Sequence, residues 1–205
     1  MSNPWLEIPL ADYEGHMGSP EVQQLRALSD LFAEALAFTQ PASVAIAGIA
    51  GGNGLDRIAT VTTRRIVGLD INPEYLEAVR NRYGDLPGLE LLDVDLSATP
   101  APTEPVDLLH AALFFEHAGF DQSLDNTLAL IAPHGTCSIV LQLPGGISIG
   151  PSGFASLQNL KSTFKLVPPD HVKRELQTRG FVLTTEKQVA VPGEKAFWMG
   201  IFRRS

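Results

Sequence analysis

Hydrophobic positions along the chain follow two patterns, short continuous runs and stripes at helical spacing. The apolar run at 44–49 is typical of a strand buried on both faces of a parallel sheet, and further strands are predicted at 66–69, 89–92, 106–112 and 137–143. The last apolar segments, 181–191 and 196–203, flank a Pro-Gly-Glu-Lys turn, which indicates an antiparallel hairpin. Alternating strands and helices therefore predict an α/β fold, a doubly wound, mostly parallel, seven-stranded Rossmann-like sheet with a C-terminal antiparallel hairpin.

Helix signals lie between these runs. Ser19-Pro20 supplies an N-cap and a first-turn proline, and apolar residues then recur every three or four positions up to Pro41. Asn72-Pro73 repeats that signal for a helix ending near Tyr83. Three further helices are expected. A short one begins at residue 55, and the others cover 121–131 and about 170–179.

The organisation expected is a single domain covering residues 1–205. Residues 1–39 form an N-terminal helical cap segment and helix, and residues 40–205 form the Rossmann-like core. Two loops interrupt the pattern, a proline-rich surface loop at 97–105 and a glycine-containing loop at 145–168 that can line or cover a site. A chain of 205 residues is long enough to bury one sizeable core.

Composition narrows the choice of partners. The 15 basic and 23 acidic residues give a net charge of −8, which repels phosphate backbones and anionic lipid, so we expect no nucleic-acid partner and no membrane partner. No basic residue precedes Arg26, so the start lacks a secretory signal pattern. The single cysteine, Cys137, suits a reducing cytoplasm and is expected in the core. The five scattered histidines predict no metal site.

The segment SVAIAGIAGGNGLDRI, residues 43–58, places four glycines within seven positions directly after the first strand. Two explanations compete, a tight turn for helix packing and a backbone that approaches a ligand closely. Ligands of open α/β sheets bind at the carboxyl ends of the strands, which favours the ligand. No lysine follows to make a phosphate-binding P-loop, and Arg57 stands where a dinucleotide fingerprint needs glycine. The third candidate ligand is S-adenosylmethionine, which has no pyrophosphate and so needs neither of these motifs.

The same segment resembles the first motif of the class I S-adenosylmethionine-dependent methyltransferases, an acidic residue followed by alternating glycines. Gly52 and Gly54 match two of these glycines, with Asn53 between them. Gly48 replaces the acidic residue, and Ala50 replaces the first glycine. The resemblance implies that these five residues bind the cofactor, and the missing carboxylate affects the support of its methionine portion.

Further motifs extend the resemblance over about residues 40–203. Asp70, followed by Ile71, resembles the acid that hydrogen-bonds the ribose hydroxyls in the family, and a carboxylate can accept from both hydroxyls. Asp95-Leu96 resembles the pair that contacts the adenine. The segment around Ala111 resembles the fourth-strand region near the methyl group.

The N-terminal sequence DYEGHM, residues 12–17, is similar to the segment that closes over the cofactor in small-molecule members of the family. The resemblance implies cofactor contacts from Tyr13, His16 and Met17. Residues 12–17 and the 145–168 loop are expected to form a lid that orders when ligand binds, since neither has enough apolar periodicity to be held by core packing.

Several of these residues have a plainer interpretation. Asp70 also fits a local cap before the 73–83 helix, and Asp95 fits a solvated loop acid. His110 is expected to be packed inside the sheet, whereas Glu116 and His117 are expected at the surface near a helix start. Tyr13 and His16 also fit ordered surface positions.

The resemblance implies a cytoplasmic S-adenosylmethionine-dependent methyltransferase with a small-molecule methyl acceptor. Residues 111–114, Ala-Ala-Leu-Phe, lack the proline and tyrosine of the motif in nucleic-acid amino-methyltransferases. The alternatives are a non-catalytic regulatory domain that binds S-adenosylmethionine or S-adenosylhomocysteine, supported by Gly48, and a nicotinamide-dependent oxidoreductase. The pattern identifies neither the catalytic residues, nor the acceptor, nor the oligomeric state.

Overall fold

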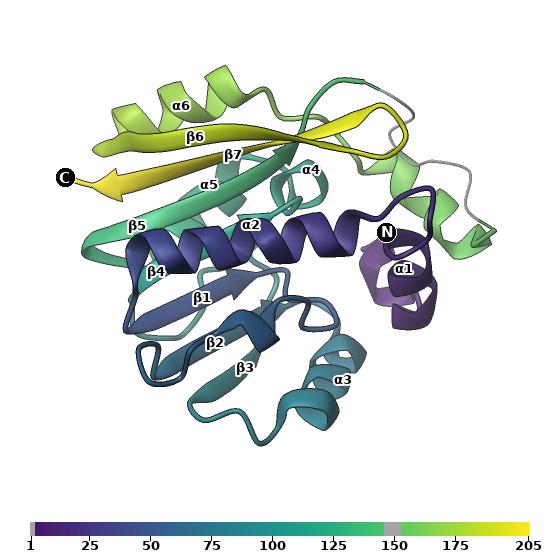
Figure 1. Cartoon of the computed structure of the whole chain (residues 1–205), viewed down its shortest axis with the longest axis horizontal. Helices are drawn as coiled ribbons and strands as arrows, with labels where there is room; N and C mark the ends of the chain where they lie inside the picture. Colours follow the sequence, from purple (N-terminus) through teal and green to yellow (C-terminus); the bar gives the residue numbers. More distant parts are fainter. Residues whose placement is uncertain (1–2, 146–152) are drawn as a thin grey trace.

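The computed structural model describes residues 3–145 and 153–205 and contains a seven-stranded sheet of order β3-β2-β1-β4-β5-β7-β6 (Figure 1). Strands β1 to β5 are parallel, and β7 runs antiparallel to both β5 and β6. This confirms the predicted mostly parallel sheet with its C-terminal hairpin. The strands are β1 (Ser43–Ala47), β2 (Arg65–Asp70), β3 (Leu89–Asp93), β4 (Val106–Ala112), β5 (Ile131–Gln142), β6 (Phe181–Val191) and β7 (Lys195–Arg204).

Helices cover both faces of the sheet, with α2 in front of it and α5 behind it in Figure 1. In β1, Val44 and Ile46 pack with α2 and α3, while Ala45 and Ala47 pack with α5 and α6. This two-residue alternation places a hydrophobic core on each face. The helices are η1 (Pro4–Glu7), α1 (Leu10–Met17), α2 (Gln24–Thr39), η2 (Leu55–Arg57), α3 (Pro73–Tyr83), α4 (Phe115–Ala118), α5 (Asp121–Leu128), η3 (Ala155–Ser162) and α6 (Pro169–Thr178).

The predicted start of the first long helix at Ser19 is wrong. The backbone N–H groups of Val22 and Gln23 do bond to the Ser19 carbonyl, which makes one turn there. Gln23 then adopts φ 45°, a left-handed conformation that ends this turn, and α2 begins at Gln24. The cap at Asn72 is confirmed, because its side chain accepts from the N–H of Glu74 at 2.9 Å.

The beginning of the fifth strand also differs from the prediction. The strand β5 begins at Ile131, which pairs with Val106, and the pairing register then shifts before Thr136 pairs with Leu108. His134 has φ 62° within this irregular stretch. The Pro-His-Gly turn therefore forms a bulge inside the strand instead of preceding it.

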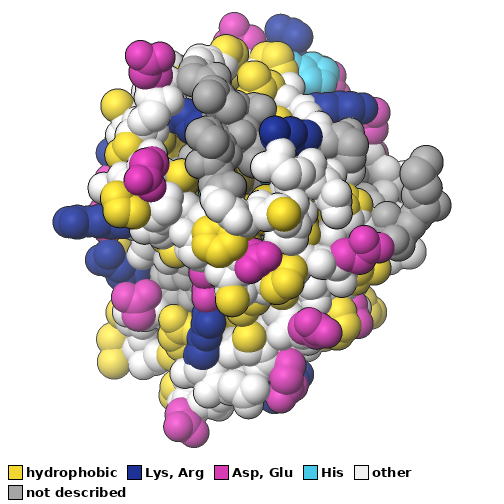
Figure 2. Space-filling view, turned by 90° about the vertical axis from the view of Figure 1, so that its right-hand side faces the viewer, with side chains coloured by type: hydrophobic (Ala, Val, Ile, Leu, Met, Phe, Trp, Pro, Cys, Tyr) yellow, Lys and Arg dark blue, Asp and Glu magenta, His cyan; other side chains and the backbone are white. Residues whose placement is uncertain are grey.

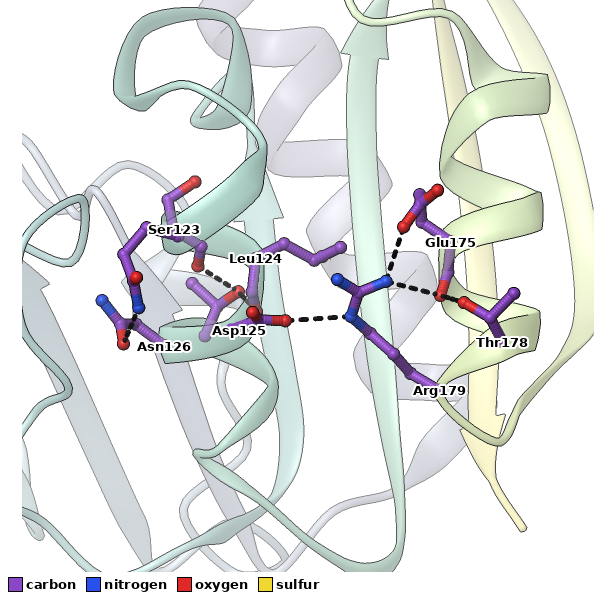
Figure 3. A network of polar contacts seen from close by, with 9 residues as sticks. Ser123, Leu124, Asp125, Asn126, Glu175, Thr178 and Arg179 are labelled. Atoms are coloured by element: carbon purple, nitrogen blue, oxygen red, sulfur yellow. Dashed lines mark hydrogen bonds and ion pairs between the residues drawn. The ribbon is translucent and has the colours of Figure 1, made fainter.

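A polar network joins the two helices α5 and α6 on the rear face (Figure 3). The Nε of Arg179 lies 2.9 Å from Oδ1 of Asp125, and its Nη1 lies 2.6 Å from Oε2 of Glu175. These side chains are partly exposed, so the network contributes at most about 1 kcal/mol per pair. Among the described residues, no helix is long and apolar enough to cross a membrane.

Candidate functional site

A pocket lies at the edge of the sheet where the parallel strands end. Its wall includes Gly48 and Ala50 after β1, Asp70 at the end of β2, Gln142 at the end of β5 and Lys195 at the start of β7. Because β7 is antiparallel, its first residue lies at the edge where β5 ends. Figure 2 views the molecule from this side, and acidic side chains are spread over the visible face among hydrophobic and basic ones.

Asp70 is a buried acid, 9% exposed, on the pocket wall. Its Oδ1 accepts the N–H of Asn72 and its Oδ2 accepts the N–H of Ala50, both at 2.9 Å. Burial raises its pKa to about 6, although backbone N–H groups oppose that shift. Each oxygen keeps a further lone-pair position, so this carboxylate can accept two hydroxyl groups from a ligand. Asp70 therefore fits both interpretations, the local cap and the ligand contact.

Ile71, Asp95 and Leu96 line the same end of the pocket. The Oδ1 of Asp95 accepts the backbone N–H of Ser97 at 2.9 Å, which fixes the loop after β3. Val94, beside Asp95 in the chain, also lines the pocket. The acid thus lies in a partly apolar pocket and is half-buried instead of fully solvated.

The glycine-rich segment divides between the pocket and the core. Gly48, with φ 70°, and Ala50, with φ 47°, line the pocket. Three other predicted contacts do not line it. A Cβ on Gly52 would meet the Tyr83 ring at 2.8 Å, a Cβ on Gly54 would meet the Phe32 ring at 2.9 Å, and Asn53 donates to the Leu25 carbonyl at 2.8 Å. Close packing against aromatic rings explains Gly52 and Gly54, and the hydrogen bond to Leu25 explains Asn53.

Ala111 also lies outside the pocket wall. It is fully buried in β4 within the rear core, whereas its neighbours Ala112, Leu113 and Phe114 line the pocket. Consecutive residues of a strand point to opposite faces, so Ala111 packs against the rear helices.

The three predicted residues of the N-terminal segment, Tyr13, His16 and Met17, all line the pocket. They belong to α1, which lies within the helical cap segment expected at residues 1–39. His16 is 6% exposed and Met17 is 5% exposed, so neither is an ordinary surface residue. Burial, followed by the nearby Lys195 charge, lowers the pKa of His16.

Specific contacts dock this segment on the core. The Asn72 amide donates to the Trp5 carbonyl at 2.8 Å, and the Tyr75 hydroxyl donates to the Ile8 carbonyl at 2.9 Å. Arg82 of α3 makes a two-nitrogen ion pair with Glu14 of α1, in which Nη2 and Oε2 are 2.9 Å apart. The N-terminal segment is thus fastened beside the turn that follows β2.

A small apolar cluster joins this segment to the helix η3. Ile8, Leu157 and Leu160 are buried together, with Trp5 and Phe164 packed against them. The expectation that neither segment is held by apolar packing is therefore wrong for the described part. The sequence pattern did not reveal this cluster because Ile8 lies about 150 positions before Leu157 and Leu160. Residues 146–152 of the expected lid loop lie outside the described residues.

Glu116 and His117 are not surface residues, contrary to expectation. Glu116 is fully buried, and its Oε1 accepts the N–H of Gln142 at 2.8 Å. Burial raises its pKa to about 7. His117 lines the pocket between the rings of Trp5 and Phe164, and burial lowers its pKa to about 4. Both lie on the short helix α4, which folds back under the end of β5.

His110 is packed inside the sheet, as predicted. Its Nδ1 lies 3.1 Å from the Ser138 hydroxyl, and its ring lies 4.6 Å from the Phe32 ring. Cys137 is a fully buried core residue, as predicted, and burial raises the pKa of its thiol. In residues 3–145 and 153–205, no group of three or more His, Cys, Asp or Glu side chains could hold a metal ion.

The polar residues of the pocket wall include Gln24 and Lys195, which sequence reasoning missed, and Gln142 at the end of β5. Gln24 and Gln142 are each 3% exposed and Lys195 is 7% exposed. Lys195 was expected in the hairpin loop. The hairpin pattern did indicate that β7 runs antiparallel. That direction places Lys195, the first residue of β7, at the edge of the sheet where the pocket lies.

A protein family model described as a methyltransferase domain matches residues 44–135. That range extends from β1 into β5 and includes the pocket residues Gly48, Asp70 and Asp95. No curated protein sequence matches the chain.

Solved structures share the fold over nearly the whole chain. The N-methyltransferase NodS from Bradyrhizobium japonicum WM9, in complex with S-adenosylhomocysteine, is 14% identical with a TM-score of 0.72, covering 99% of each chain. Magnesium protoporphyrin IX methyltransferase (ChlM) from Synechocystis PCC 6803, with bound S-adenosylmethionine, is 10% identical with a TM-score of 0.72, covering 100% of this chain and 98% of that one. The [4+2]-cyclase SpnF is 13% identical with a TM-score of 0.66, covering 89% of this chain and 81% of its own.

Proposed function

Because the chain carries a methyltransferase domain on the class I methyltransferase fold, we propose that it binds S-adenosylmethionine and methylates a small molecule. The observation that carries the proposal is the position of Asp70, a buried carboxylate at the end of β2 that lines the same pocket as Gly48 and Ala50. An acid at this place suits a ribose, whose two hydroxyls both donate.

The residues of this end of the pocket fit the cofactor. Asp70 would hold the ribose, while Asp95 and Leu96 would contact the adenine. Gly48 leaves room beside the turn after β1, although a Cβ there would lie 3.2 Å from the Phe114 ring. The pocket thus combines acceptors for hydroxyl and amine groups with an apolar surface for a base.

When bound, the cofactor supplies a methyl group on a sulfonium, which is already a good leaving group. The chain's own contribution is to align the acceptor and to keep water out. Three aromatic side chains line the pocket, Trp5 and Tyr13 from the N-terminal segment and Phe164 from the chain after η3. Their apolar rings are suited to exclude water. No catalytic acid or base is assigned.

A small-molecule acceptor is favoured by the cover over the pocket. The N-terminal segment and η3 together restrict the opening, and a macromolecular substrate would need that cover to move. The acidic side chains on this side of the molecule (Figure 2) and the net charge of −8 also oppose binding of a nucleic acid. NodS and ChlM, which share the fold, are both named as methyltransferases, and this agrees with the proposal.

The second candidate is a domain that binds the cofactor without catalysis. Gly48 supports it, since this position holds an acidic residue in the motif that the segment resembles. The fold alone does not decide, because the cyclase SpnF shares it.

Thermal unfolding with added ligand tests the proposal. S-adenosylmethionine and S-adenosylhomocysteine are expected to raise the unfolding midpoint, because they bind only the folded state, whereas NAD is not. A rise with NAD alone would overturn the proposal. Binding of the cofactor without any S-adenosylhomocysteine formed from a broad panel of small acceptors would favour the non-catalytic candidate.

A further inference from the structure

The polar residues of the pocket are divided by charge along the sheet. Asp70 and Asp95 follow β2 and β3, whereas Gln142 and Lys195 belong to β5 and β7. The strands β1, β4 and β5 separate β2 from β7. At the usual strand spacing, the two ends of the pocket are therefore on the order of 20 Å apart. If the acidic end takes the cofactor, as proposed above, the β5–β7 end is left for the acceptor.

Lys195 gives this second end a positive charge. Its side chain is buried and lines the pocket, and burial lowers its pKa. Its charge acts on His16, whose pKa it lowers further, so the two side chains lie within electrostatic reach of each other. Glu116 lies next to the end of β5. Its carboxylate accepts the N–H of Gln142 and is not part of the described pocket wall.

Two histidines supply neutral hydrogen-bonding groups to the pocket, and the charge of Lys195 acts on one of them, His16. The Nδ1 atoms of His16 and His117 are buried and have no hydrogen-bond partner among the described residues. Burial lowers both pKa values, so both rings are neutral at pH 7. A buried polar atom without a partner is costly, and a bound ligand with a hydroxyl or carboxylate group would remove that cost.

Aromatic rings also line the pocket. The His117 ring lies 4.9 Å from the Trp5 ring at 87° and 5.2 Å from the Phe164 ring at 63°. Phe114 and Leu113 also line the pocket. Such walls favour a flat, apolar ligand body by area burial and edge contacts.

We propose, on the basis of the proposed function, that the methyl acceptor is a small aromatic acid whose carboxylate is bound by Lys195, with His16 beside it. An ammonium group in a cavity of low dielectric constant attracts a carboxylate far more strongly than it does in water. A cationic acceptor would lie beside a like charge, which the same environment makes costly. Lys195 is thus the residue that selects the acceptor, and Asp70 has no part in that selection.

The test uses matched pairs of ligands on the full chain saturated with S-adenosylhomocysteine. Benzoate is compared with benzamide and 4-hydroxybenzoate with 4-hydroxybenzamide, by calorimetry or by thermal shift. Each acid is expected to bind at least tenfold more tightly than its amide to the wild type. Lys195→Met is expected to remove that preference, and Lys195→Arg to keep part of it. Lys187→Met, on the neighbouring strand β6 and paired with Glu34, is the control and is expected to keep it fully.

Three results would overturn the inference. One is binding of S-adenosylhomocysteine with no preference for any acid over its amide, which leaves the proposed function standing. Another is a preference that persists in Lys195→Met. The third is tighter binding of phenyl phosphate than of benzoate, which would assign the site to a phosphate. Failure of S-adenosylhomocysteine itself to bind would instead overturn the proposed function and this inference with it.

Discussion

The carboxylate of Asp70 accepts the backbone N–H of Ala50, with 2.9 Å between oxygen and nitrogen. This bond joins the end of β2 to the turn after β1, and both segments line the pocket. The same side chain accepts the N–H of Asn72 and so fixes the start of α3. Asp70 therefore shapes the wall that it helps to form, and its two roles must be separated by experiment.

Asp70→Ala is expected to weaken binding of S-adenosylhomocysteine by about 1.5–3 kcal/mol, the usual range for hydrogen bonds to a charged group. Calorimetry measures the change. Asp93→Ala is the matched control, since Asp93 pairs with Asp70 across β2 and β3 but is exposed and does not line the pocket. Unchanged affinity in a folded Asp70→Ala protein would leave Asp70 with the structural role alone.

Glu116→Gln is expected to alter how stability depends on pH. In the folded chain the pKa of Glu116 is raised from 4.5 to about 7, so the folded state keeps a proton that the unfolded chain releases. The wild type therefore loses stability as the pH rises from about 4.5 through about 7. Glutamine does not titrate, so the variant should gain stability relative to wild type between pH 5 and pH 8, by up to about 3 kcal/mol.

Urea unfolding at the two pH values measures that difference. Glu104→Gln, an exposed glutamate, serves as the control and should change stability equally at both values. If Glu116→Gln did the same, Glu116 would have to be charged in the folded state, with a partner that the Gln142 N–H does not account for.

The cover over the pocket is expected to open and close as one unit. Leu157→Ala removes a buried side chain from the cluster that joins η3 to the N-terminal segment, so amide hydrogen exchange should become faster in both 10–17 and 155–162. S-adenosylhomocysteine should slow exchange in both segments of the wild type. Leu166→Ala, at an exposed position, should change neither. Faster exchange in one segment only would mean that the two move independently.

Gly54 and Gly48 are expected to respond differently to alanine. Gly54→Ala should lower the free energy of unfolding by about 1–3 kcal/mol, because φ is 91° and the Cβ would press on the Phe32 ring. Its affinity for S-adenosylhomocysteine should remain, since Gly54 does not line the pocket. Gly48→Ala should weaken that affinity. Gly119→Ala, with φ 81° and nothing within 4 Å of its Cβ, isolates the backbone strain.

Urea unfolding and calorimetry on the three variants decide between packing and ligand binding. A loss of affinity in Gly54→Ala at temperatures where it is fully folded would return this glycine to the cofactor site.

The sheet was predictable because the signal for each strand lies in the residues of that strand. The run at 44–49 is apolar on both faces, and both faces are in fact buried. The packing of the N-terminal cap segment was not predictable in the same way, because the cluster that holds it depends on Leu157 and Leu160, far along the chain. Glu116 was misplaced because a glutamate near a helix start is ordinarily solvated, and only the tertiary contact with the N–H of Gln142 accounts for its burial.

The antiparallel direction of β7 has a consequence for how the protein matures during synthesis. The pocket residues that follow β1, β2 and β3 leave the ribosome long before Lys195 of the opposite wall does. During synthesis, the residue proposed to select the acceptor is therefore the last of the described pocket residues to emerge.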